Sequence, residues 1–176
     1  MRSDRELLTL IKADNQTGLE ELYKKYYSQL CDFAFQYVGS VDLSEEVVSD
    51  VFLKVWQRRH KLSLDPNFKK YLYTATRNQA LNYIEKEKSD NESLDDNAEG
   101  LVSKKYQPDE NFIYKELENR LEFLISTLPP RRKLIFKLSR LEGFSYKEIA
   151  DVMSISVRTV QNQMVEAIKK IASCIK

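Results

Sequence analysis

The sequence predicts an all-α protein made of two small helical domains joined by a flexible acidic linker. Apolar residues recur at separations of three and four along most of the chain, which is the period of an amphipathic helix. The 176 residues include only four glycines and four prolines, fewer than hairpin-rich folds require. A polar, acidic stretch interrupts the pattern and predicts three parts: a domain over 1–86, a linker over 87–111 and a domain over 112–176.

The first domain is expected to begin with three helices. Apolar spacing over 4–37, with a polar interruption near its middle, predicts two of them. Asp42 stands three residues before Glu45, the spacing at which both side chains can cap a helix start. A third helix is therefore expected from this point to about Arg59.

A loop and a fourth helix complete this domain, and two further helices open the next one. Pro66 disfavours helix at the residue before it, so we expect a loop over 60–67 and a helix over 68–86. Beyond the linker, the segment 112–127 is amphipathic. Two prolines then separate it from a helix expected over 131–141, with the second proline near the first turn.

The segment 141–170 predicts a helix-turn-helix. Ser145 and Glu148 have the spacing of a capping box at the start of a short helix. Ser154 stands at the turn, and Ser156 can cap the second helix. The expected inward residues are Ile149, Ala150, Val152 and Met153 of the first helix, then Val157, Val160, Met164 and Ile168 of the second.

The outward face of the second helix is rich in groups that match base edges. A plain surface helix would more often carry Glu and Lys than the three consecutive amides at 161–163. Amide and guanidinium groups hydrogen-bond to bases in the major groove, and an apolar side chain can meet a thymine methyl. The alternative is a generic helical hairpin. The face comprises Arg158, Gln161, Asn162, Val165, Glu166 and Lys169.

Charge alternates along the chain, although the formal net charge is only +1. Residues 1–53 carry 5 basic and 10 acidic side chains, 54–88 carry 9 and 3, 89–111 carry 2 and 7, and 112–176 carry 12 and 7. The two basic blocks indicate two separate nucleic-acid contacts. The alternative is that these helices simply carry solvated charges.

The first basic block interleaves cations with aromatic rings and amides. Cations bind phosphates, while unpaired bases need flat rings to stack on and amides to read their edges. The block therefore predicts a contact with single-stranded nucleic acid. The alternative is that its rings belong to the core, an interpretation that suits Trp56 and Tyr83 better than Tyr71 and Tyr73.

Other classes of function find little support. His60 is the only histidine, and no glycine-rich phosphate loop or recognisable carboxylate pair occurs, so we do not expect an enzyme. Cys31 and Cys174 lack the spacing of a metal site or disulfide framework, and we expect no metal, no cofactor and two buried or half-buried thiols. No secretory signal or spanning segment is expected, which favours a cytoplasmic protein.

Three segments resemble an extracytoplasmic-function sigma factor of the sigma-70 family. They are DVFLKVW at 50–56, FKKYLYTATRNQALNYI at 68–84 and LPPRRKLIFKLSRLEGFSYKEIADVMSISVRTVQNQM at 128–164. In that family the first two belong to sigma region 2 and the third to region 4. The resemblance covers nearly the whole chain. It implies a factor that binds core RNA polymerase, recognises the −35 and −10 promoter elements and promotes DNA melting.

The resemblance also implies roles for individual residues. The contact with the polymerase clamp helices would involve Asp50, Val51, Leu53, Lys54, Trp56 and Gln57. The loop over 60–67 and the next helix would read the −10 element, with one base flipped out, through Lys69, Lys70, Tyr71, Tyr73, Arg77, Asn78 and Asn82. The −35 duplex would be read by Arg158, Thr159, Gln161, Asn162, Val165 and Lys169. The acidic linker would pass near the RNA path, and an anti-sigma factor is implied as a partner.

Two other functions remain as alternatives at this stage. A stand-alone helix-turn-helix regulator would bind its operator tightly, usually as a symmetric dimer, but no dimerisation helix is evident in the sequence. A helical adaptor for other proteins would leave the amides at 161–163 unexplained.

Overall fold

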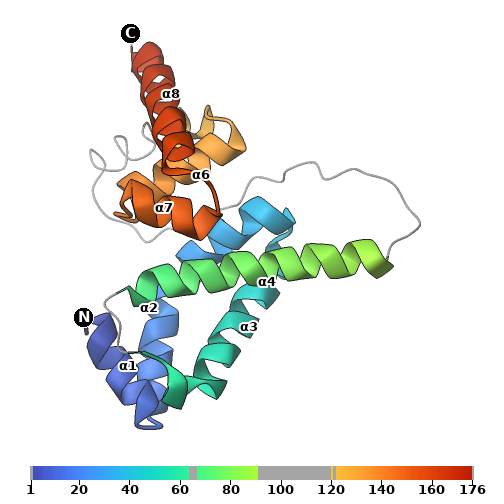
Figure 1. Cartoon of the computed structure of the whole chain (residues 1–176), viewed down its shortest axis with the longest axis vertical. Coiled ribbons are helices and arrows are strands. Elements are labelled where there is room, and N and C mark those ends of the chain that lie inside the picture. The colour runs from blue at the N-terminus through green and yellow to red at the C-terminus, as the bar shows by residue number, and fades with distance from the viewer. Residues whose placement is uncertain (1, 64–66, 91–119, 121, 176) are drawn as a thin grey trace. The chain divides into compact units, whose positions relative to one another are not determined.

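The computed structural model describes residues 2–63, 67–90, 120 and 122–175, and every regular element in these ranges is a helix (Figure 1). The predicted all-α fold is confirmed. The chain forms two compact units, Met1–Leu101 and Val102–Lys176. Among the described helices, none combines the length and apolar character that crossing a membrane requires. From position 91 onward, the expected acidic linker lies outside the described residues.

Two helices begin the first unit, as the spacing predicted. α1 spans Asp4–Lys12 and α2 spans Gln16–Val38 (Figure 1). Gly18 lets them cross closely, because a Cβ at this position would lie only 2.8 Å from the Leu10 Cβ. α2 ends at Gly39, whose φ of 65° is a left-handed conformation that glycine adopts without strain.

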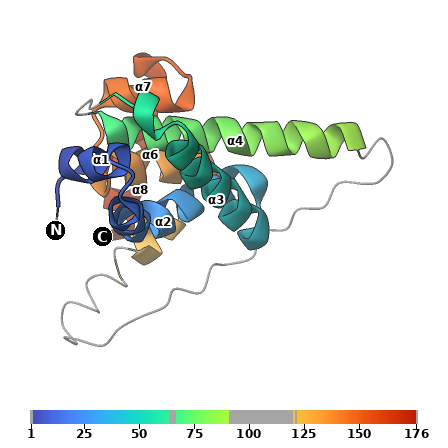
Figure 2. The same cartoon turned by 90° about the horizontal axis from the view of Figure 1, so that it is seen from below.

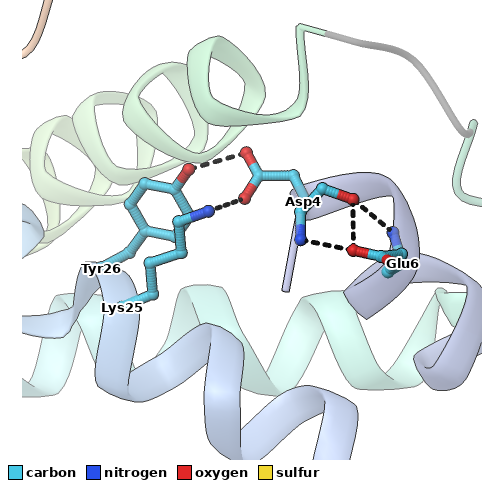
Figure 3. A network of polar contacts seen from close by, with 5 residues as sticks. Asp4, Glu6, Lys25 and Tyr26 are labelled. Carbon is cyan, nitrogen blue, oxygen red and sulfur yellow. Dashed lines mark hydrogen bonds and ion pairs between the residues drawn. The ribbon is translucent and has the colours of Figure 1, made fainter. Parts of the chain in front are cut away.

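Asp4 ties α1 to α2. Its carboxylate accepts hydrogen bonds from Lys25 Nζ at 2.6 Å and from the Tyr26 hydroxyl at 2.7 Å (Figure 3). At the same end of α1, Ser3 and Glu6 form a capping box. The two bonds to Asp4 favour one orientation of α1 on α2, because each needs a defined geometry that apolar packing alone does not impose.

α3 spans Val41–Gln57, and its cap is Ser40 rather than Asp42. The Ser40 Oγ accepts a hydrogen bond from the Leu43 amide at 3.4 Å. The expectation for Asp42 was wrong because the chain already enters the helix before it, directly after the left-handed end of α2. A short 3-10 turn, η1, follows α3 at Arg59–Lys61.

α4 spans Phe68–Asp90 and ends four residues beyond the expected boundary. Glu and Lys are good helix formers, so the polar run at 85–88 does not end the helix. α4 packs on α2 and α3, and its carboxyl-terminal part extends past α3 in both views (Figures 1 and 2). The core of this unit includes Leu22, Leu30, Phe33, Ala34, Val47, Val51, Val55, Leu72, Tyr73 and Ala80.

The second unit contains three described helices of two turns or more. α6 spans Pro130–Arg140, α7 spans Tyr146–Met153 and α8 spans Val157–Ile175. α6 begins with its proline in the first turn, as predicted. Residues 122–126 are also helical, and most of the helix expected before α6 lies outside the described residues. α8 packs against both α6 and α7.

The inward stripe of α8 differs from the predicted one. Val157 and Ile168 were expected inside but are exposed, whereas Val160, Met164 and Ala167 are buried. Positions 160, 164 and 167 lie on one side of a helix with 3.6 residues per turn. α6 and α7 cover the buried side of α8. The apolar residues of α8 fit two overlapping stripes, and their spacing alone does not show which stripe the neighbouring helices cover.

Candidate nucleic-acid interface

α7, a tight turn and α8 form the predicted helix-turn-helix. The Glu148 amide donates to Ser145 Oγ at 3.3 Å, and the Ser145 amide donates to the Glu148 carboxylate at 2.8 Å. Ser154 has a φ of 51°, which turns the chain between the helices. Ser156 Oγ accepts a hydrogen bond from the Thr159 amide at 3.0 Å. The capping box, the turn and the second cap are therefore confirmed.

α8 exposes four of the side chains expected to read duplex DNA. Arg158, Gln161, Asn162 and Val165 are all exposed. Their separations of three and four place them on one face of the helix. The face therefore presents a guanidinium, two amides and an apolar group, and these groups can recognise base edges in a major groove.

Two other residues expected in this contact have partners within α8. Lys169 is exposed and forms a 3.0 Å ion pair with Glu166. The Thr159 hydroxyl lies 2.8 Å from Ser156 Oγ, so this side chain takes part in the helix start. Exposed ion pairs contribute little to stability, so the bond between Lys169 and Glu166 costs little to exchange for a phosphate.

Gln163, the third of the consecutive amides at 161–163, does not lie on the exposed face of α8. Gln163 Oε1 accepts a hydrogen bond from Arg132 Nε of α6 at 3.2 Å. The amides exposed on the outward face are thus Gln161 and Asn162. Gln163 instead links α8 to α6, a role that its place among three amides did not reveal.

One face of α4 gathers three of the residues expected at the −10 element. Tyr71, Asn78 and Asn82 are exposed, and separations of seven and four align them along the helix. Tyr71 is 38% exposed, and its ring stacks on Phe68 with 5.4 Å between ring centroids and 23° between planes. Arg77 lies beside this face and donates to Asn78 Oδ1 at 3.3 Å. A ring and two amides on one face suit unpaired bases.

Tyr73 does not belong to this face. It is 1% exposed, and its ring makes a T-shaped contact with Phe33 of α2 at 5.0 Å between centroids and 70° between planes. The structure corrects the expectation that this ring stacks on a base, because the aromatic pair is part of the core. Lys69 and Lys70 are half-buried.

The residues expected to contact polymerase are divided between the surface and the core of α3. Leu53, Lys54 and Gln57 are exposed, and half-buried Asp50 lies on the same side of α3 at helical spacing. Val51 is 1% exposed, which corrects the expectation that it forms part of a contact surface. Trp56 is half-buried. The exposed part of this set is therefore a narrow stripe.

A polar network joins α3 to α4, and its central residue was missed from the sequence. Gln79 is 8% exposed, and its Nε2 donates to Asp50 Oδ2 at 2.8 Å while its Oε1 accepts from Lys54 Nζ. The Tyr83 hydroxyl lies 3.0 Å from the same Asp50 oxygen and 2.8 Å from Glu46 Oε1. Asp50 and Lys54, both expected at the polymerase, thus also hold α4 in place.

Tyr83 acts as a donor in this network. Burial raises the pKa of Tyr83 above its ordinary value, and the hydrogen bonds to Glu46 and Asp50 add to the rise. The phenol therefore keeps its proton at neutral pH. A sequence signal for the network does exist, because separations of four place Asp50 with Lys54, and Gln79 with Tyr83, on single helix faces.

The cysteines and carboxylates do not form a metal site in the described parts of the chain, where no group of three or more possible His, Cys, Asp or Glu ligands occurs. Cys31 is half-buried, as expected. Cys174, near the end of α8, is exposed, so the expectation of a buried or half-buried thiol there was wrong.

Two family models match the chain. Sigma-70 region 2 matches residues 22–89, and sigma-70 region 4 matches residues 118–171. The first range contains the α4 face and the second contains the helix-turn-helix. Full-length relatives agree: an "ECF RNA polymerase sigma-E factor" from Escherichia coli is 26% identical over 173 residues, which cover 94% of this chain and 90% of that protein.

A relative with the same description from Haemophilus influenzae is 25% identical over 173 residues, which cover 94% of this chain and 91% of the relative. The helical fold, its two polar faces and these matches define a transcription initiation factor of the sigma class. The chain belongs to the sigma-70 family, within its extracytoplasmic-function group. Sigma factors are initiation factors and not enzymes.

Solved structures share the fold. CnrH, determined in complex with the cytosolic domain of CnrY, has a TM-score of 0.58 and 18% identity, with 98% of this chain and 96% of that chain covered. The sigma factor RpoE of Bartonella quintana, in complex with the anti-sigma factor NepR, has a TM-score of 0.59 and 18% identity, with 89% and 95% covered.

Proposed function

We propose that this sigma factor binds core RNA polymerase, recognises the −35 and −10 promoter elements and promotes melting of the promoter DNA for transcription initiation. The polymerase docks on α3 along the stripe of Asp50, Leu53 and Gln57. The division of labour follows the chain: region 2 functions belong to 1–86 and region 4 functions to 112–176, with the linker over 87–111 between them.

The −10 element is bound as single-stranded DNA by α4. The Tyr71 ring stacks on an unpaired base, and Asn78 and Asn82 hydrogen-bond to base edges. Arg77, Lys69 and Lys70 neutralise nearby phosphates in this proposal. The observation that carries the proposal is the position of Asn78, which directly precedes Gln79, the residue that bonds to the docking helix. Docking of polymerase on α3 is then linked to α4, the helix that captures the DNA strand.

The −35 element is read as duplex by α8. Arg158, Gln161 and Asn162 donate to and accept from base edges, and Val165 meets a thymine methyl. Lys169 exchanges its ion pair with Glu166 for a phosphate. The confirmed helix-turn-helix supports this assignment, because its second helix is the one that enters the major groove.

Isolated promoter DNA binds weakly in this proposal, since a chain with a formal net charge of +1 releases few counterions. The polymerase supplies the rest of the affinity. An anti-sigma factor is included as a regulatory partner, because the structure of Bartonella quintana RpoE, which shares this fold, is a complex with one.

The test is transcription in vitro with core RNA polymerase from a promoter pool randomised in the −35 and −10 regions, with and without this protein. We expect protein-dependent transcripts with base preferences in both regions, together with co-elution of protein and core on gel filtration. Absence of both the transcripts and the complex refutes the proposal. Tight binding to DNA without polymerase would instead identify a stand-alone helix-turn-helix regulator.

A further inference from the structure

The turn between α1 and α2 holds the chain segment that follows α3. Arg59 Nε donates to Asp14 Oδ1, and His60 Nε2 lies 3.3 Å from the same oxygen. Lys12 Nζ donates to the Leu62 backbone carbonyl at 2.5 Å. We name the contacts made by Lys12 and Asp14 the Asp14 clamp. It connects residues 45 to 50 positions apart in the chain and so belongs to the tertiary structure.

Arg59 is the centre of these contacts. Its guanidinium carbon lies 4.4 Å from the Trp56 ring centroid, and its NH1 donates to the Trp56 carbonyl at 2.8 Å. The hydrogen bond from Arg59 lowers the pKa of Asp14 below its ordinary value, so the carboxylate is ionised at neutral pH. A carboxylate, a ring and a carbonyl thus hold one guanidinium, which restricts the path of η1.

The turn at Asp14 has a backbone conformation that residues without a carboxylate can adopt. Its φ of 61° is left-handed, a conformation that glycine adopts without strain and that asparagine and aspartate tolerate better than other residues. Glycine or asparagine would therefore make the same turn. What aspartate adds is the charge that Arg59 binds.

We propose that the Asp14 clamp positions residues 59–63 and thereby sets how strictly the sigma factor discriminates among −10 bases. The inference rests on the proposed function, in which α4 binds the −10 element, because residues 59–63 come shortly before α4 in the chain. Asp14 and Lys12 are positioning residues, since they act through Arg59 and the Leu62 carbonyl. Discrimination among −10 bases depends on Asp14 and Lys12, because groups that bind DNA distinguish similar bases only when supporting contacts hold them in place.

The test compares wild-type and Asp14→Gly holoenzymes on the same promoter pool, randomised in the −35 and −10 regions, with sequencing of the transcribed templates. Glycine suits the φ of 61°, so the turn is kept while the contacts of the Asp14 carboxylate with Arg59 and His60 are lost. We expect the ratio between the most and least favoured −10 base to fall roughly fivefold, which corresponds to about 1 kcal/mol. The −35 preferences, read from the same molecules, stay unchanged.

Two further variants separate positioning from general loss of stability. Lys12→Met removes the bond to the Leu62 carbonyl and should also reduce −10 discrimination. Asp4→Asn weakens the contacts of α1 with α2 at the opposite end of α1 from the clamp, and should leave discrimination intact. Unchanged −10 preferences in Asp14→Gly, or an equal loss in Asp4→Asn, overturn the inference. A wild-type holoenzyme without any −10 preference overturns the proposed function itself.

Discussion

Gln79 of α4 donates a 2.8 Å hydrogen bond to Asp50 of α3. The preceding residue, Asn78, lies on the exposed face of α4, while Asp50 lies on the stripe of α3 that we propose for polymerase docking. A displacement of α3 therefore moves Gln79 and the face next to it. The contact gives a physical route by which docking and capture of a promoter strand are coupled.

Replacing Gln79 by Leu should lower the free energy of unfolding of the first unit by about 1–3 kcal/mol, since Asp50 loses a donor and Lys54 an acceptor at a largely buried position. Leucine retains the helix propensity and approximate volume. Urea unfolding can be followed by the fluorescence of Trp56, the only tryptophan in the chain. The matched variant Gln36→Leu, at an exposed site of α2, should stay within about 0.5 kcal/mol, and equal effects would contradict the prediction.

Asn78→Ala should weaken promoter opening and leave binding to core polymerase intact. The exposed amide accepts a hydrogen bond from Arg77 of the same helix, so its loss should weaken the contact with DNA rather than the packing of α4, by about 1 kcal/mol or roughly fivefold. Permanganate reactivity of thymines in the −10 region measures opening, and gel filtration measures core binding. Loss of core binding in this variant would refute the separation of the two roles.

Gln161→Ala should relax base preference in the −35 region by about 1–3 kcal/mol at one position. Gln163→Ala is the matched control, because the same residue type two positions away faces Arg132 of α6 instead of the exposed face. Selection from the randomised promoter pool measures both. We expect only the first variant to change the −35 preference, and a similar change in both would show that packing of α8 is responsible.

Ser154→Gly should raise the stability of the second unit by about 0.5–1 kcal/mol, because relief of left-handed strain exceeds the extra chain entropy that glycine loses on folding. Hydrogen exchange of the α7 and α8 amides measures the change in this unit by itself. Ser139→Gly, within α6, is the control and should reduce protection. A loss of protection in Ser154→Gly would contradict the prediction, because it would show that the serine side chain stabilises the unit by more than its left-handed backbone destabilises it.

Cys174 should react with iodoacetamide before Cys31. Burial raises the pKa of the Cys31 thiol to about 11, so at pH 8 little thiolate is present, and half-burial also limits access. Cys174 is exposed. Modification of Cys31 should accelerate as the pH rises towards 11, which mass spectrometry of digested protein can follow at pH 8 and pH 10. Faster reaction of Cys31 at pH 8 would contradict this order.

Local features were predictable because their physics is local. A capping box joins residues three positions apart, so Ser145 and Glu148 could be recognised from spacing alone. The same reasoning failed at Asp42, where the preceding left-handed glycine allows Ser40 to begin the helix earlier. The exposure of most side chains on the two polar faces was also anticipated, since amides and cations at helical spacing mark a polar face.

The sequence by itself determined the helices, the turn between α7 and α8 and the family, because these depend on periodicity and on residue order. Only the tertiary structure decided which polar and aromatic side chains are buried or paired with residues of another part of the chain. Tyr73 packs on Phe33 of another helix, Gln79 bonds to a carboxylate 29 positions earlier, and Asp14 reaches across 45 positions to Arg59. The direction in which a helix faces its neighbours sets these pairs, and that direction depends on the packing of the whole unit.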